Sequence, residues 1–125
     1  MIDNKGNISY WNKAAQRIFG YTEKEAIGKE VHIFLVPEKY HKAYRKGFSK
    51  FKKTGQGPVI GKTLEILAVR KDGVEIPIEL SVSAIRIQGE WHSIGIVRDI
   101  TQRKQAEKKI KHLNAVLRAL SLIHI

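Results

Sequence analysis

Residues 95–101 read GIVRDIT and run directly into QRKQAEKKIKHLNAVLRAL at 102–120. The first stretch is typical of a buried strand, and the second of a long exposed helix. Asp99 and Thr101 stand between them, where their side chains can accept hydrogen bonds from the first free N–H groups of the helix. Losing such a cap costs about 1 kcal/mol. We therefore expect Asp99, Ile100 and Thr101 to form a joint that passes a signal from a folded domain into the helix.

The helix after the joint carries an apolar seam. Its residues recur at steps of four and three, which is typical of two helices pairing in a coiled coil. We expect a homodimer through this helix, with Ile110, Leu113 and Leu117 transmitting the signal, because the opposite face is highly charged. The alternative is a helix that folds back onto its own sheet. The seam consists of Ala106, Ile110, Leu113, Leu117 and Leu120.

Upstream of the joint, the pattern of apolar residues predicts an α+β fold with a five-stranded antiparallel sheet and helices on one face. Asn12 and Thr22 are predicted to begin two short helices, the second through a capping box with Glu25. The predicted helices are 13–19, 22–28, 30–35 and the longer 38–53; the predicted strands are 1–3, 8–11, 62–70, 74–87 and 91–100.

Composition narrows the possible functions. The 125 residues include no cysteine, so the sequence excludes disulfides, a cysteine nucleophile and a flavin–cysteinyl adduct. The net charge of +11 lies mainly in 41–53 and 103–111, and we interpret both runs as solvated helix faces. We therefore expect no nucleic-acid partner. Because no apolar run spans a bilayer, we expect no membrane contact from this segment and a cytoplasmic location, although a longer parent could be membrane-anchored.

Several motifs occur in one order along the chain and together resemble a PAS domain with its C-terminal PAC half. The resemblance covers residues 1–101 and implies a non-enzymatic sensor or dimerisation module that is linked to a histidine kinase, cyclase or phosphodiesterase. The motifs are Ile2-Asp-x-x-Gly-x-Ile8, Trp11-Asn-x-Ala-Ala15, Phe19-Gly-Tyr-Thr22, Glu25-x-Ile-Gly28, Thr54-Gly55, Arg70-Lys-Asp-Gly73, Pro77-Ile-Glu-Leu80 and Val97-Arg-Asp-Ile-Thr101.

The resemblance also sets expectations about the ends of the chain. Members of the family have a longer first strand before Ile2, so we expect a fragment of a larger protein, with the output domain missing. Residues 102–119 would then be a signalling linker helix. The tail 120–125, Leu-Ser-Leu-Ile-His-Ile, reads like the translation of a transposase end used in sequencing libraries, so we expect it to be an adapter artefact.

The resemblance implies a pocket between sheet and helices that holds haem, flavin, a small metabolite or nothing. Haem-type relatives carry a histidine on the long helix, and Tyr44 stands at that position here. His41 lies one helical turn earlier and is a second candidate ligand. Trp91 is a candidate for stacking against a flavin, although packing in the core explains it as well. The expected function is a sensor that passes a conformational change to an output domain; a cofactor-free dimerisation module and a haem or flavin sensor are the alternatives.

Overall fold

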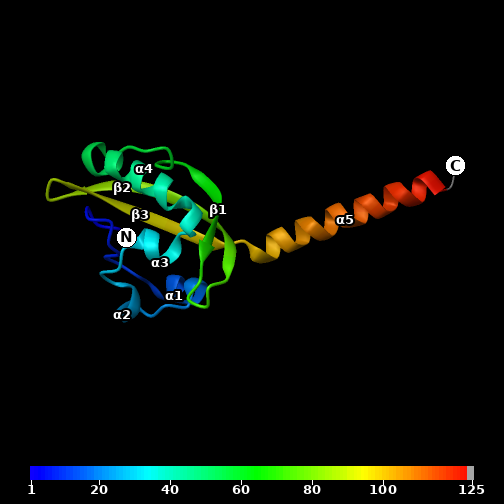
Figure 1. The fold of residues 1–125 in the computed structure, drawn as a ribbon, viewed down its shortest axis with the longest axis horizontal. Helices are drawn as coiled ribbons and strands as arrows, with labels where there is room; N and C mark the ends of the chain where they lie inside the picture. Colours follow the sequence, from blue (N-terminus) through cyan, green and yellow to red (C-terminus); the bar gives the residue numbers. More distant parts are fainter. Residues whose placement is uncertain (124–125) are drawn as a thin grey trace.

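The computed structural model describes residues 1–123, and the side chains as far as Leu120. The backbone forms a curved sheet, a layer of helices against one face of it, and a long helix that leaves the domain (Figure 1). The elements are α1 (Lys13–Phe19), α2 (Glu23–Ala26), α3 (Val31–Leu35), η1 (Glu38–Tyr40), α4 (His41–Thr54), β1 (Thr63–Val69), β2 (Glu75–Ile87), β3 (Glu90–Asp99) and α5 (Thr101–Ile123).

The described sheet has three strands, not the five that the sequence predicted. They pair antiparallel in the order β1–β2–β3, with Leu80 of β2 opposite Leu64 on one side and Val97 on the other. The two missing strands correspond to residues 1–11, where pairing is limited to isolated bridges. Ile2 exchanges both backbone hydrogen bonds with Ser93 of β3, at 2.8 and 2.9 Å.

Residues 8–11 do not form a strand of the sheet, because the backbone groups of Ile8 make their hydrogen bonds elsewhere. The N–H of Ile8 donates to the carbonyl of Lys29, and the carbonyl of Ile8 accepts from the N–H of Gly28. Both groups therefore bond to the segment between α2 and α3 and not to a neighbouring strand. The predicted turn at residues 4–7 is present, with Gly6 at a φ of 83°.

The predicted helix starts are confirmed in atomic detail. The Asn12 side chain accepts a hydrogen bond from the N–H of Ala15 at 2.8 Å, and Gly20 ends α1 in the left-handed conformation. Thr22 and Glu25 form the reciprocal capping box at the start of α2. The predicted helix over 38–53 divides into the short η1 and the longer α4, since the chain turns at Tyr40 before α4 begins.

The net positive charge of the protein comes from two helices. The helix α4 contains six of the 23 lysine and arginine residues and no carboxylate, whereas α5 contains six and one carboxylate. The eleven cations and eleven carboxylates elsewhere cancel. All six cations of α4 are exposed, and none lies within 4 Å of a carboxylate among the described residues. The predicted solvated face of α4 is therefore confirmed.

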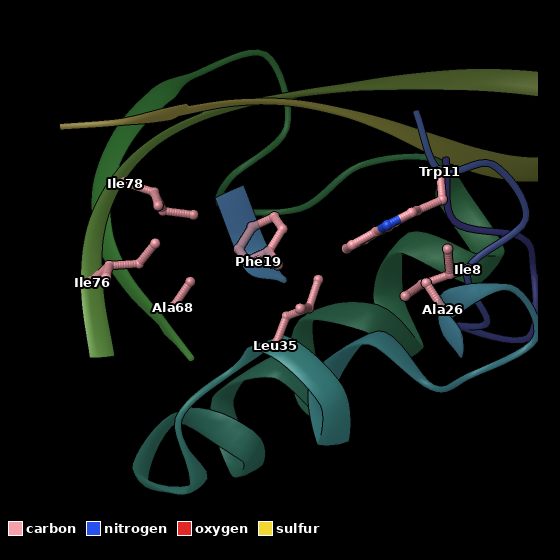
Figure 2. Close-up of a cluster of buried hydrophobic side chains, with 8 residues drawn as sticks. All are labelled: Ile8, Trp11, Phe19, Ala26, Leu35, Ala68, Ile76 and Ile78. Atoms are coloured by element: carbon pink, nitrogen blue, oxygen red, sulfur yellow. The ribbon is translucent and has the colours of Figure 1, made fainter. Parts of the chain in front are cut away.

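The core lies between the sheet and the short helices. Figure 2 shows the Phe19 ring in the middle of it, with Ile76 and Ile78 of β2 on one side and Trp11 on the other. The rings of Trp11 and Phe19 are 5.6 Å apart, and the Trp11 indole N–H donates to the carbonyl of Tyr21 at 2.9 Å. The buried cluster consists of Ile8, Trp11, Phe19, Ala26, Leu35, Ala68, Ile76 and Ile78.

The helix α5 extends away from the domain as a single helix (Figure 1). It does not fold back onto the sheet, and a coiled coil, which the sequence predicted, is not evident. Within residues 1–123, no helix combines the length and the apolarity that crossing a membrane requires. The structure continues the helix to Ile123, past the predicted linker boundary at Ala119. The end of the predicted adapter tail, residues 124–125, lies outside the described residues.

Candidate functional site: an apolar cavity and the strand–helix joint

A cavity of about 920 Å³ lies between the sheet and α4. Strands β2 and β3 form one wall through Leu80, Val82, Gly95 and Val97, which the pairing register places side by side. The opposite wall comes from the apolar side of α4. The residues of that helix that line the cavity are Ala43, Tyr44, Gly47, Phe48 and Phe51.

The wall of the cavity is almost free of charged side chains. Among the lining residues, only Glu65 has a side chain that is charged near neutral pH. Its carboxylate forms ion pairs with Arg103 and Lys104 of α5. No lysine, arginine or histidine of the described chain lines the cavity. The hydroxyls of Tyr44 and Ser93 stand at the wall, and neither has a hydrogen-bond partner within the described part of the chain. A molecule in this space would therefore meet apolar groups and very few polar ones.

The predicted cofactor residues on α4 are separated by the structure. Tyr44 lines the cavity, where burial raises the pKa of its phenol to about 12. His41 does not line the cavity, because its Nε2 is 2.7 Å from the carbonyl oxygen of Val36. The ring of His32 stacks against the ring of Tyr44, with their centroids 5.0 Å apart. Burial lowers the pKa of His32, so its imidazole is neutral near pH 7.

The third predicted residue, Trp91, packs against the end of α4 and not against the cavity. Gly55 lies so close to the indole that a Cβ added there would be 2.5 Å from Cε2 of Trp91. The Arg86 guanidinium lies over the Trp91 ring, 5.8 Å from the ring centroid. Trp91 instead lines a separate open cleft of about 540 Å³, together with Lys52, Lys53 and other polar residues.

The predicted joint has one of the two caps that its sequence suggested, because Asp99 accepts a hydrogen bond there whereas the Thr101 hydroxyl donates one. One carboxylate oxygen of Asp99 accepts from the backbone N–H of Thr101 at 2.9 Å and from the Thr101 hydroxyl at 2.6 Å. Ile100 between them is only 3% exposed, and its N–H donates to the carbonyl of Pro77 in β2 at 3.1 Å. The start of α5 is thus attached to β2 as well as to β3.

A set of ion pairs adds a second attachment, which the sequence had not predicted. Arg103 in the first turn of α5 contacts Glu65 of β1 at 2.6 Å and Glu79 of β2 at 3.3 Å. Lys104 also contacts Glu65, and that hydrogen bond holds the pKa of the carboxyl below its usual range and raises the pKa of the ammonium. We call Glu65, Glu79, Arg103 and Lys104 the joint ion pairs. They connect β1 and β2 to the first turn of the helix, and Asp99 at the end of β3 adds the third strand.

Beyond the joint, the seam of α5 faces solvent. Ile110, Leu113 and Leu117 are 59%, 56% and 53% exposed. These three large apolar side chains lie at heptad spacing on an exposed face of the helix. The structure shows no partner for it within the described chain, so transmission and pairing through these residues stay predictions.

Comparison with known proteins decides the family. The family model described as "PAS domain" matches residues 1–102. The chain belongs to the PAS domain family. This confirms the resemblance on which the sequence predictions rested and gives the three-stranded sheet, α4 and the cavity their place within a PAS fold.

Two curated relatives are sensors. The sensor protein FixL of Bradyrhizobium diazoefficiens is 33% identical over 94% of this chain and 23% of its own length. The oxygen sensor protein DosP of Escherichia coli is 23% identical over 90% of this chain and 14% of its own length. The chain therefore spans less than a quarter of the length of these relatives. Among solved structures, a PAS domain from Colwellia psychrerythraea has a TM-score of 0.63 and 30% identity, covering 80% of this chain and 82% of that one.

Metal binding through side chains has no support in the part of the chain that the structure describes. No group of three or more histidine, cysteine, aspartate or glutamate residues there is arranged to hold a metal ion. The histidines other than His41 do not form such a group among the described residues; they are His32, His92 and His112. His124 lies outside the described residues.

Proposed function

We propose that this PAS domain senses the state of its cavity and passes a conformational change through the strand–helix joint into α5. The observation that carries the proposal is the position of the joint residues on the cavity strands. Leu80 and Val97 line the cavity, and their strands hold α5 one and two residues away, through Glu79 and Asp99. A shift of β2 or β3 that accommodates an occupant would therefore move the residues that orient the helix.

The proposed output lies in a longer parent protein, in which α5 is the linker to a histidine kinase in the cytoplasm. Support comes from the similarity to FixL and from a chain that covers only part of its relatives. PAS domains are regulatory modules, so the chemistry would belong to the attached domain. The ligand state would then bias an enzyme that the 125 residues do not contain.

The second candidate is a cofactor-free dimerisation module, favoured by the exposed seam of α5. A second copy is the occupant that this seam fits, because the apolar residues recur at heptad spacing and a coiled coil pairs such positions with their equivalents. The span covers about two heptads, and isolated helices of this length are marginally stable. Pairing would therefore depend on the contribution of the domains or of the parent protein.

The proposed function is tested by fusing this chain, in heptad register, to the kinase region of a dimeric histidine kinase. A variant that fills the cavity, Gly95→Ile, is expected to change the autophosphorylation rate several-fold. The double change Asp99→Ala and Thr101→Ala should weaken that response, because it removes the two hydrogen bonds of Asp99 at the start of α5 and leaves Ile100 and the joint ion pairs in place. Autophosphorylation with radioactive ATP measures the response.

The matched control is Asp72→Ala at the turn between β1 and β2. Asp72 accepts a hydrogen bond from the N–H of Val74 at 3.0 Å, the same local pattern as at Asp99, but among the described residues no hydrogen bond or ion pair joins it to α5. This control should leave the response intact. A response of unchanged size in the Asp99 and Thr101 variant, or one that is weakened equally in the Asp72 variant, would show that the hydrogen bonds of the joint do not carry the signal.

A further inference from the structure

We infer that the cavity binds a neutral, largely apolar organic molecule and that it accommodates neither haem nor a flavin nucleotide. The inference rests on the proposed sensory function and names the class of ligand that the cavity takes. Three features of the wall carry the argument: its charge, its possible iron ligands, and its unpaired hydroxyls.

The first feature is the absence of lysine, arginine and histidine side chains along the wall; the one cation of a lining residue is the N-terminal ammonium of Met1, which donates to the carbonyl of Tyr10. Haem carries two carboxylates and a flavin nucleotide carries phosphate, and burying such anions without a partner is costly. No lysine or arginine of the described chain lines the cavity, although the protein as a whole carries 23 of them. The six cations of α4 all face solvent, on the side of the helix away from the cavity. An anionic ligand would therefore lose its hydration without gaining an ion pair.

The second feature is the lack of a suitable axial ligand. Haem iron in proteins is held by histidine, cysteine, methionine or tyrosine side chains. The chain has no cysteine, and no histidine lines the cavity in the described residues. Met1 lines it, but a methionine in cytochromes ligates haem iron together with a histidine, which this wall lacks. Tyr10 and Tyr40 also line it, and both residues are exposed to solvent. Tyr44 does line it, but burial keeps its phenol protonated, with a pKa of about 12. Its nearest charged neighbours, Glu30 and Asp3, are acidic and oppose the tyrosinate that iron would require.

The third feature sets what the ligand can offer. The hydroxyls of Tyr44 and Ser93 are polar groups at the wall without a partner in the described chain. Each can donate or accept one hydrogen bond to a neutral group such as a carbonyl or a hydroxyl. The cavity is also lined by Asn12, Glu65, Tyr10 and Tyr40. Most of the remaining wall is aliphatic or aromatic, including Phe48, Phe51 and Leu80. The volume of about 920 Å³ falls in the range of small-molecule sites.

The test is a titration of the isolated chain with a neutral fluorescent probe, N-phenyl-1-naphthylamine, in parallel with hemin and flavin mononucleotide. We expect saturable binding of the probe, with a blue-shifted emission, and no saturable binding of the two anionic cofactors. Gly95→Ile should weaken probe binding about tenfold or more, since the added side chain occupies the cavity. Gly95 tolerates the change in its backbone, because its φ is not positive and a Cβ would meet Leu80 at 3.4 Å.

Two further variants keep the outcome interpretable. Val82→Phe fills the cavity from β2, directly opposite Gly95, and serves if Gly95→Ile does not fold. Ser83→Ile adds the same apolar side chain on the other face of β2, opposite Ile94, and should leave probe affinity unchanged. Saturable binding of hemin or flavin mononucleotide that displaces the probe would overturn the inference. So would the absence of probe binding, or an affinity that the filling variants do not alter. In each of these cases the joint test above still decides the proposed function separately.

Discussion

Replacement of Phe19 by alanine is expected to lower the free energy of unfolding by about 3–5 kcal/mol. Phe19 is 3% exposed and lies between the sheet and Trp11, so that its removal leaves a space that neither side can fill without moving (Figure 2). The loss combines the transfer of an aromatic ring to water with the free energy of the cavity that remains. Urea denaturation followed by circular dichroism measures it.

The control for Phe19 is Ile33→Ala, at a side chain that is 65% exposed. Substitutions at exposed positions usually change stability by no more than about 0.5 kcal/mol. A loss at Phe19 no greater than the loss at Ile33 would contradict the central position of the Phe19 ring. An unchanged slope of the free energy against urea would show that both variants report stability and not a changed denatured state.

Replacement of Gly55 by alanine is expected to lower the free energy of unfolding by about 2–4 kcal/mol, the sum of a backbone and a packing effect. Gly55 ends α4 at a φ of +69°, which alone is unfavourable for alanine. In addition, the new Cβ would lie 2.5–2.8 Å from three carbon atoms of the Trp91 indole. Either Trp91 or the end of α4 must move, and thermal denaturation measures the result.

Gly61→Ala separates the two effects. Gly61 has a similar φ of +76°, but a Cβ added there meets nothing within 4 Å. It should therefore show the backbone effect alone, about 1–2 kcal/mol. Equal losses of stability at Gly55 and Gly61 would show that contact of the new Cβ with Trp91 adds nothing to the destabilisation. A larger loss at Gly55 would support the position of Trp91 as a packing residue of the α4 end.

Local sequence signals predicted most of the fold because the interactions behind them are local. The caps at Asn12 and Thr22 depend on residues three positions apart, and both are present. The long strands and the turn at Gly73 follow from alternation and turn residues within a few positions. The five-stranded sheet was wrong for the opposite reason. Whether residues 1–11 form strands depends on partners far away in the sequence, and Ile8 bonds to Lys29 instead of to a strand.

The candidate site shows the same division. Asp99 was predicted correctly to accept a hydrogen bond from the start of α5, because its partner is only two residues away, whereas the Thr101 hydroxyl donates to Asp99 instead of accepting a bond from the helix. The joint ion pairs were not predicted, since Arg103 and Glu65 are 38 residues apart and meet only through the pairing of β1 with β2. Alternation along β1 and β2 was the available signal, because it places Glu65 and Glu79 on one face. His41 and Tyr44 share a side of α4, yet only the fold shows that Tyr44 alone reaches the cavity.

The most direct test of the account is the response of α5 to a change in the cavity. In ¹H–¹⁵N spectra of the isolated chain, Gly95→Ile should shift the amide signals of Arg103 and Lys104, whereas Ser83→Ile on the outer face should not. Adding Asp99→Ala and Thr101→Ala should reduce the shift, because only Ile100 and the joint ion pairs would then position the first turn. If filling the cavity leaves the α5 amides unchanged while the β2 and β3 amides move, the cavity and the helix are not coupled, and the proposed transmission is wrong.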